Sequence, residues 1–136
     1  MSDVKKLIHE MDMEMSKKSF RYFFEEIQGF HYSHHHESWV DGLNESRYYC
    51  VKASRDHGKS TLFMSYGLWL AAFKPKTSIM IFSHSLEQTL EHMRFIRTQI
   101  ETIPMLHHLK PEGRPWAKSY FDFTNKSRIM GKSVGG

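Results

Sequence analysis

The residues best suited to chemistry lie together in one segment of the chain, with the sequence ASRDHGKST. Its Gly-Lys-Ser matches the end of the phosphate-binding pattern G-x-x-x-x-G-K-[ST]. In such a P-loop, backbone N–H groups surround phosphate oxygens, the lysine neutralises the outer phosphates, and the serine hydroxyl ligates Mg²⁺. The glycine lets the backbone approach the phosphate closely. We therefore predict a nucleotide-phosphate site made of Ala53, Ser54, Arg55, Asp56, His57, Gly58, Lys59, Ser60 and Thr61, in which the Ser60 hydroxyl holds the metal.

The sequence on either side of this segment fits a P-loop. The run 47–52 (RYYCVK) predicts a strand, and Ser60 to Phe73 predicts a helix whose positive N-terminal end would face the phosphate. One departure is Ala53, which occupies the position of the first glycine. A second copy of the tripeptide, at 131–133, has Lys126 at that position and only three residues after it, so we interpret it as a loop.

Length and composition place the chain among ordinary globular proteins. Its 136 residues suggest one domain, and its net charge of +4 is compatible with nucleic-acid contact without requiring it. Cys50 is the only cysteine, which excludes a disulfide within the chain. The N-terminus does not resemble a signal peptide, and the longest apolar run, 68–73, is too short to cross a membrane. These features predict a cytoplasmic protein.

The N-terminal third should be a helix followed by an irregular segment. Apolar residues recur at helical spacing from residue 3 to about 28, with a break near 16–19, and Gly29 suits a C-terminal cap. In the irregular segment from Phe30 to Glu45, Phe30, Tyr32 and Trp39 are candidates for stacking on adenine, and Trp39 could instead pack under the sheet. A cluster of histidines, at 31 and 34–36, is better interpreted as a solvated loop than as a metal site.

The rest of the chain predicts a parallel α/β unit. Residues 77–83 (TSIMIFS) read as a strand buried on both faces, and Ser85 to Gln88 form a capping box that opens a helix ending at Pro104. A loop or broken turn follows from 105 to 115, and a hairpin with Asn125-Lys126 at its turn closes the chain. The predicted fold is an incomplete P-loop NTPase-type parallel sheet with flanking helices, preceded by an N-terminal helix and ending in a β-hairpin.

From about Phe20 to Gly136, the sequence resembles the amino-terminal part of a phage large terminase, the ATPase that pumps DNA into procapsids. Three stretches carry the likeness: the loop ASRDHGKST, the strand and helix IMIFSHSLEQTLEHMRFIR, and IPML with Trp116 and the tail FDFTNKSRIMGKSVGG. The resemblance implies that residues 1–45 lead into the ATPase core and that 46–136 are the first portion of a P-loop ATPase domain. It further implies ATP and Mg²⁺ as cofactors. Double-stranded DNA, a small terminase subunit and a portal protein would be the partners, and no membrane is involved.

The resemblance also implies roles for single residues. Lys59 would act on the phosphates, and Arg55 would be the loop arginine, a sensor or cis-acting finger for the γ-phosphate, as suits a fixed, forked cation. In the family, the acidic residues of the Walker B strand and a nuclease domain follow the region that matches Gly136. We therefore expect this chain alone to bind ATP without hydrolysing it. The alternatives are a non-catalytic fragment that binds a nucleotide or a partner, and another P-loop motor of helicase type.

Overall fold

The computed structural model describes residues 3–32, 50–52, 57–110, 117 and 119–133, with side chains described for all of these except 50–52 and 57–60. In chain order the helical and strand elements are as follows: α1 (Asp3–Lys18), α2 (Phe20–Tyr22), the π-helical turn η1 (Phe23–Ile27), β1 (Cys50–Lys52), α4 (His57–Phe73), β2 (Ser78–Ser83), α5 (Leu86–Thr102), the 3-10 helix η2 (Pro104–Leu109), β3 (Tyr120–Asp122) and β4 (Arg128–Ser133). The protein is thus of mixed α/β class.

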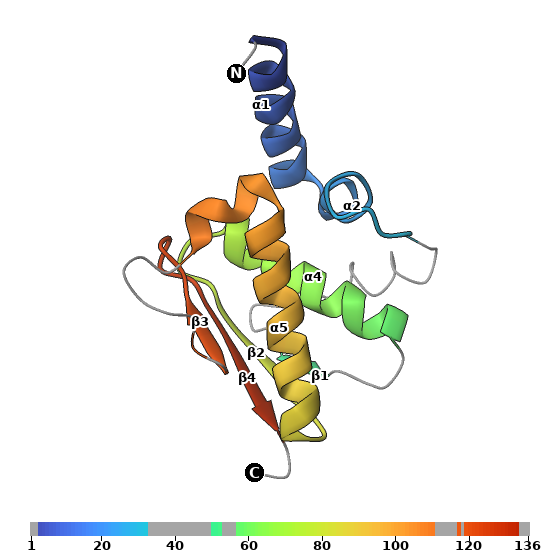
Figure 1. The fold of residues 1–136 in the computed structure, drawn as a ribbon, viewed down its shortest axis with the longest axis vertical. Coiled ribbons are helices and arrows are strands. Elements are labelled where there is room, and N and C mark those ends of the chain that lie inside the picture. The colour runs from blue at the N-terminus through green and yellow to red at the C-terminus, as the bar shows by residue number, and fades with distance from the viewer. Residues whose placement is uncertain (1–2, 33–49, 53–56, 111–116, 118, 134–136) are drawn as a thin grey trace.

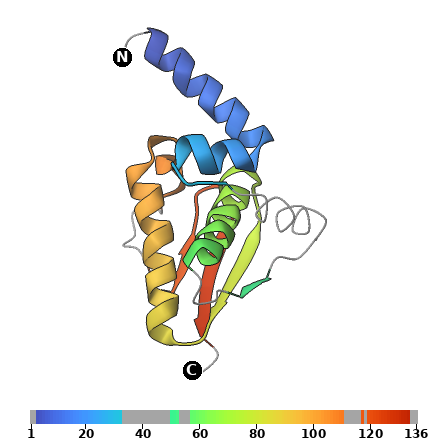
Figure 2. The same ribbon diagram turned by 90° about the vertical axis from the view of Figure 1, so that its right-hand side faces the viewer.

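The strands form one four-stranded sheet in the order β1-β2-β4-β3. β1, β2 and β4 run parallel, with Val51 opposite Ile81 and Ile81 opposite Gly131, and β3 is antiparallel to β4. Helices α4 and α5 lie on the same face of this sheet (Figures 1 and 2). The parallel arrangement with helical crossovers confirms the predicted order of strand, helix, strand and helix.

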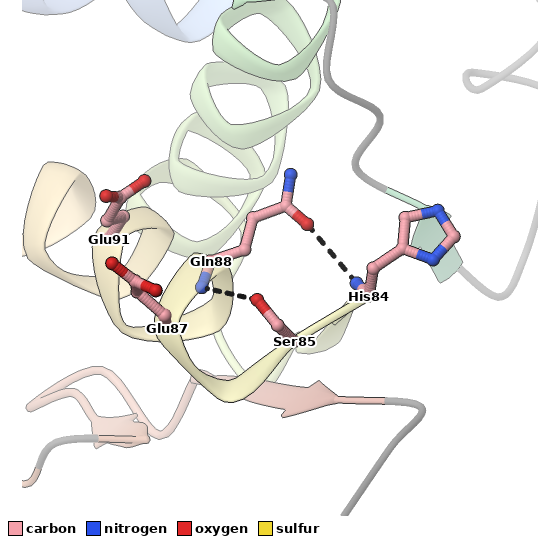
Figure 3. A pocket seen from close by; sticks show the side chains of 5 residues that line it. All are labelled: His84, Ser85, Glu87, Gln88 and Glu91. Atoms are coloured by element: carbon pink, nitrogen blue, oxygen red, sulfur yellow. Dashed lines mark hydrogen bonds between the residues drawn. The ribbon is translucent and has the colours of Figure 1, made fainter.

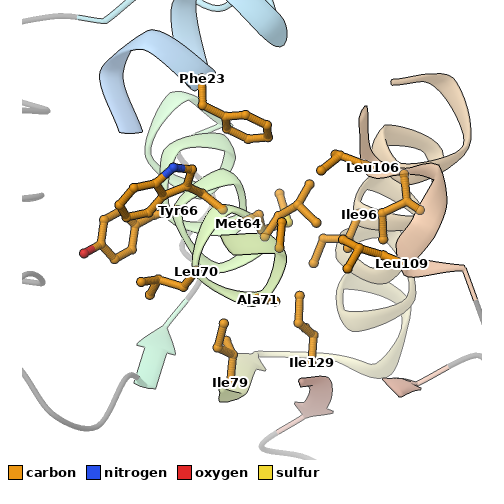
Figure 4. Close-up of a cluster of buried hydrophobic side chains, with 14 of the residues drawn as sticks. Phe23, Met64, Tyr66, Leu70, Ala71, Ile79, Ile96, Leu106, Leu109 and Ile129 are labelled. Atoms are coloured by element: carbon orange, nitrogen blue, oxygen red, sulfur yellow. The ribbon is translucent and has the colours of Figure 1, made fainter. Parts of the chain in front are cut away.

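The hydrophobic core lies between that face of the sheet and the helices. Residues from α4, α5, η1, η2 and both central strands meet there, including Phe23, Leu70, Ile79, Ile96 and Ile129 (Figure 4). α4 is buried almost all round from Leu62 to Ala72 because other elements pack on several of its sides. In β2, only one face is fully buried: Ile79, Ile81 and Ser83 are buried, whereas Met80 and Phe82 are half-buried. The prediction of a strand buried on both faces was therefore wrong.

The N-terminal helix is interrupted where the sequence indicated a break. α1 ends at Lys18, and Ser19 caps the next helical segment by accepting a hydrogen bond from the Tyr22 backbone N–H at 3.2 Å. Gly29 has a φ of +80°, and the N–H of Phe30 closes the helical end on the Phe24 carbonyl at 3.0 Å. The predicted glycine cap is confirmed, because this left-handed conformation is strained for other residues.

The C-terminal hairpin is confirmed at its predicted place, but its loop is longer than two residues. The Lys126 N–H donates to the Phe123 carbonyl, the Phe123 N–H donates to the Ser127 carbonyl, and Lys126 has a φ of +73°. This is the pattern of a three-residue loop that ends in a bulge. Strand β4 then continues through Gly131, Lys132 and Ser133. The interpretation of this second Gly-Lys-Ser as a loop was wrong, because the tripeptide pairs with β2 along its whole length.

Phe30 and Tyr32, two of the residues considered for adenine stacking, pack against other aromatic rings. The Phe30 ring lies 5.3 Å from that of Phe24 and 6.1 Å from that of Phe95, and Tyr32 is buried beside Phe20. Their packing in the core argues against the prediction that either ring stacks on adenine. Trp39 and the histidines at 34–36 lie outside the described residues.

Candidate functional site

The candidate site lies at the edge of the sheet where the parallel strands end. β1 ends at Lys52, β2 at Ser83 and β4 at Ser133, and the register places these three ends side by side. Ligands of open α/β sheets bind outside this carboxyl edge. Helices α4 and α5 both begin there, since each follows one of these strands. The sheet therefore brings two helix N-termini to the same edge.

The predicted phosphate-binding segment spans the connection from β1 to α4. Ala53, Ser54, Arg55 and Asp56 lie outside the described residues, so the structure does not place the loop arginine. The backbone of His57, Gly58, Lys59 and Ser60 forms the first turn of α4, and Thr61 is half-buried in the next position. The helix thus begins at His57, three residues before the predicted start at Ser60. Strand, short connection and helix follow one another in the order that a P-loop requires.

At the start of α5, a separate pocket of about 280 Å³ is lined by five residues: His84, Ser85, Glu87, Gln88 and Glu91 (Figure 3). Ser85 is the N-cap, and its hydroxyl oxygen accepts a hydrogen bond from the Gln88 N–H at 3.1 Å. The Gln88 side chain accepts from the His84 N–H at 3.2 Å. This confirms the predicted capping, except that the glutamine reaches back to His84 instead of Ser85.

The two helix N-termini differ in what they can bind. In α5 the Ser85 side chain already uses the Gln88 N–H of the first turn, and Glu87 and Glu91 bring negative charge to the pocket. In α4 the first turn includes Lys59 and no acidic residue, and one acidic residue, Asp56, directly precedes it in the sequence. An anion is stabilised by N–H groups and positive charge and is repelled by carboxylates. Of the two helices, α4 is therefore the better place for a phosphate.

A buried polar contact underlies this edge. Ser83 is the last residue of β2, and its hydroxyl oxygen lies 3.0 Å from Nδ1 of His92 on α5. Both side chains are buried. Burial lowers the pKa of His92, with a smaller opposing effect from the charge of Glu91. A neutral imidazole is favoured here because a cation would lose hydration. The contact fixes the end of β2 against α5.

Asp122 is the one carboxylate of the hairpin strands, and it lies at the other edge of the sheet. It pairs with Arg128, whose Nε and Nη2 donate to the two carboxylate oxygens at 2.5 and 2.9 Å. Arg128 opens β4, about 17 Å along the strand from Ser133 at a rise of about 3.3 Å per residue. Asp122 is thus held by an arginine and is too far away to act at the carboxyl edge.

The pocket at α5 was not predicted from the sequence, although the capping box and the two glutamates can be recognised there. Within the described part of the chain, no group of three His, Cys, Asp or Glu residues is placed to hold a metal ion. No helix in that part is long and apolar enough to span a lipid bilayer.

Neither of two comparisons with known proteins identifies the chain. No protein-family model matches the sequence, and a search of curated proteins returns no significant match. The functional conclusion must therefore depend on the site itself and on the motifs of the sequence.

Proposed function

We propose that this chain is a nucleotide-binding protein of the P-loop class and binds Mg-ATP where α4 begins. One observation carries the proposal: β1 is parallel to β2 and β4, and Gly58-Lys59-Ser60 falls in the first turn of the helix that follows β1. Phosphate-binding loops use this combination of a parallel-strand edge, a helix N-terminus and a lysine. Lys59 in this turn adds support, since a cation stabilises the phosphates.

Within this class, we propose the ATP-binding front part of a viral DNA-packaging motor of the large terminase type. The resemblance of the loop, of the strand and helix after it, and of the C-terminal tail supports this choice. The complete motor would power movement of double-stranded DNA into a procapsid, together with a small terminase subunit and a portal. In it, Lys59 and Arg55 would stabilise charge on the transferred phosphoryl group, and Ser60 would hold Mg²⁺.

We further propose that the 136-residue chain by itself binds ATP but does not hydrolyse it. Hydrolysis requires one carboxylate that helps to hold Mg²⁺ and another that orients the attacking water. Asp122 cannot supply either group, because Arg128 holds it at the opposite edge of the sheet. This observation also favours the second candidate function, a non-catalytic module that binds nucleotide only.

The proposal is tested by calorimetric titration of the purified chain with Mg-ATP, comparing the variants Lys59→Ala and Lys132→Ala. Lys132 provides a matched control because it is the lysine of the second Gly-Lys-Ser but is exposed on strand β4. Removing a lysine that contacts phosphate costs about 1.5–3 kcal/mol, so Lys59→Ala should weaken binding roughly 10- to 100-fold. Lys132→Ala should bind like the wild type.

A folded wild-type chain that fails to bind Mg-ATP would refute the proposed site. An equal loss of Mg-ATP affinity in the two lysine variants would show that binding depends on overall positive charge and not on the loop. A phosphate-release assay on the same samples tests the second part of the proposal. Release that is abolished by Lys59→Ala would show that a catalytic carboxylate is present in the chain, and Glu87 and Glu91 of the α5 pocket would be the first residues to replace.

A further inference from the structure

The end of the sheet opposite the candidate site is formed by two turns that are hydrogen-bonded to each other. One turn follows α4 and leads into β2, and the other connects β3 with β4 (Figure 1). The Lys76 N–H donates to the Asn125 carbonyl at 3.3 Å, and the Ser127 hydroxyl donates to the Lys74 carbonyl at 3.1 Å. The Asn125 side chain also donates to the Ala71 carbonyl at 2.6 Å. The two turns therefore form one surface, which we call the joined turns.

The joined turns carry three exposed lysines and no acidic residue. The lysines are Lys74, Lys76 and Lys126. The carboxylate nearest to them in the sequence, Asp122, is already held by Arg128. Among the described residues, no carboxylate forms an ion pair with any of the three ammonium groups. Within the described part of the chain, the surface therefore presents three positive charges that no neighbour neutralises.

Two of these lysines occupy backbone conformations that suit other residue types. Lys76 has a φ of +64° and Lys126 a φ of +73°. Glycine and asparagine adopt this left-handed conformation more readily than lysine does. Strained backbone of this kind concentrates at functional sites. The presence of lysine at both positions therefore points to a use for its charge.

The side chains around the lysines favour a nucleic-acid duplex over two other polyanions. Surfaces that bind anionic membranes combine lysines with exposed apolar residues, and single-stranded nucleic acids stack their bases on exposed aromatic rings. Here Phe73 packs against the core and Phe123 is buried. The ring of the partly exposed Tyr120 has the Arg128 guanidinium over it, 5.4 Å from the ring centre. A duplex requires neither feature, because it presents closely spaced phosphates to separate point charges.

We propose that the joined turns bind the phosphate backbone of double-stranded DNA through Lys74, Lys76 and Lys126. Only the choice of DNA as the duplex rests on the proposed function. The contact lies at the amino edge of the sheet, about 17 Å along β2 from the carboxyl edge. Helix α4 begins at the proposed nucleotide site and ends directly before Lys74, so one helix joins the two sites.

The expected signature of this contact is its dependence on salt. Each phosphate that a lysine neutralises releases counterions and contributes about −0.9 to the slope of log K against log salt concentration. Three contacts therefore contribute a slope of about −2.7. Such contacts position a protein on a duplex but do not read its sequence, so a duplex of any sequence is a suitable probe.

Fluorescence anisotropy of a labelled 20-base-pair DNA duplex, titrated with the whole chain at about 50–200 mM KCl, tests the proposal. The variant removes the three charges by Lys74→Gln, Lys76→Asn and Lys126→Asn. Asparagine is chosen at the two left-handed positions because it tolerates that conformation, and circular dichroism verifies the fold. The variant should bind the duplex at least about 10-fold more weakly at 50 mM KCl, and its slope should be smaller in magnitude by about 2–3.

A matched control removes the same amount of charge elsewhere. It carries Lys6→Gln, Lys18→Gln and Lys132→Gln, at exposed positions on α1 and at the other end of β4. This control should bind the duplex like the wild type. Calorimetry with Mg-ATP separates the two proposals, because the variant of the joined turns should bind Mg-ATP like the wild type. A chain that binds DNA through the three lysines but does not bind Mg-ATP would refute the nucleotide site alone.

Four results would overturn the DNA contact. The first is a folded wild-type chain that does not bind the duplex at 50 mM KCl. The second is an equal loss of DNA affinity in the variant and in the control, which would show that only net charge matters. The third is tighter binding of a single strand than of the duplex. The fourth is binding to vesicles of anionic lipid that depends on the three lysines when duplex binding does not, which would identify a membrane-surface site.

Discussion

Replacing Gly131 with alanine should destabilise the protein through one steric contact. Gly131 lies in β4 directly beneath α5, and a Cβ atom added there would lie 2.6 Å from Cγ2 of Thr89. The next nearest atoms, Cγ and Sδ of Met93, would be 3.1 and 3.2 Å away. The methionine is flexible and can move aside, whereas the threonine is stiff about its χ1 angle. The conflict with Thr89 therefore dominates.

Thr89 cannot rotate away without a loss of hydrogen bonds. Its hydroxyl proton is shared between the carbonyl oxygen of Lys132 at 3.2 Å, a contact that joins α5 to β4, and that of Ser85 at 3.1 Å, within the start of α5. Overpacking of a core typically costs about 1–3 kcal/mol. Replacing a glycine within a strand raises the free energy of unfolding by about 0.5–1 kcal/mol, because glycine loses the most conformational freedom on folding. We expect Gly131→Ala to lower the free energy of unfolding by about 1–2 kcal/mol.

Urea denaturation followed by circular dichroism measures this change. The midpoint should fall by about 0.5–1 M with an unchanged m value. The same substitution is then made in a Thr89→Ser background, which removes Cγ2 but keeps the hydroxyl group, and there Gly131→Ala should be nearly neutral. Gly67→Ala is a control within α4, where the nearest atom to the new Cβ is Cγ2 of Ile79 at 3.4 Å. That variant should be stabilised by about 0.5–1 kcal/mol. Equal destabilisation by Gly131→Ala in both Thr89 backgrounds would refute the steric explanation.

Two further predictions concern buried polar contacts. Burial lowers the pKa of His92 in the folded state, so below pH 6.5 the unfolded chain binds more protons than the folded chain. The stability that the neutral ring contributes is therefore complete above pH 6.5 and declines as the pH falls below that value. In His92→Asn, the asparagine side chain can still accept a hydrogen bond from Ser83 but does not titrate. Between pH 8 and pH 5, the urea midpoint should therefore fall less for the variant than for the wild type. Identical pH dependence of the two midpoints would contradict this prediction. Trp69→Phe removes the indole donor to the buried Ser16 carbonyl and should cost about 1–3 kcal/mol by the same assay. It should also increase hydrogen exchange in the last turn of α1, and unchanged exchange there would show that the bond does not anchor the helix.

Several features of this protein could be predicted from the sequence because they depend on neighbouring residues. The break near Ser19, the glycine cap at Gly29 and the N-cap at Ser85 each follow from a side chain or a backbone freedom at that position. The alternation of strands and helices, and therefore the parallel sheet, follows from the spacing of apolar residues and turn signals. The phosphate-site residues were predicted by type and spacing, and the structure adds the helical start at His57.

Other features depended on contacts between segments far apart in the chain. The second Gly-Lys-Ser resembles the first by sequence, but pairing with β2 makes it a strand, and Gly131 is required there by the approach of Thr89 from α5. The sequence predicted that β2 is buried on both faces, whereas helices cover only one of them. Apolar spacing predicted α1 as a helix but could not show that several of its apolar side chains remain exposed. Local sequence determines which elements form because propensities and caps act over a few residues, whereas burial depends on which elements meet, and only the tertiary structure decides that.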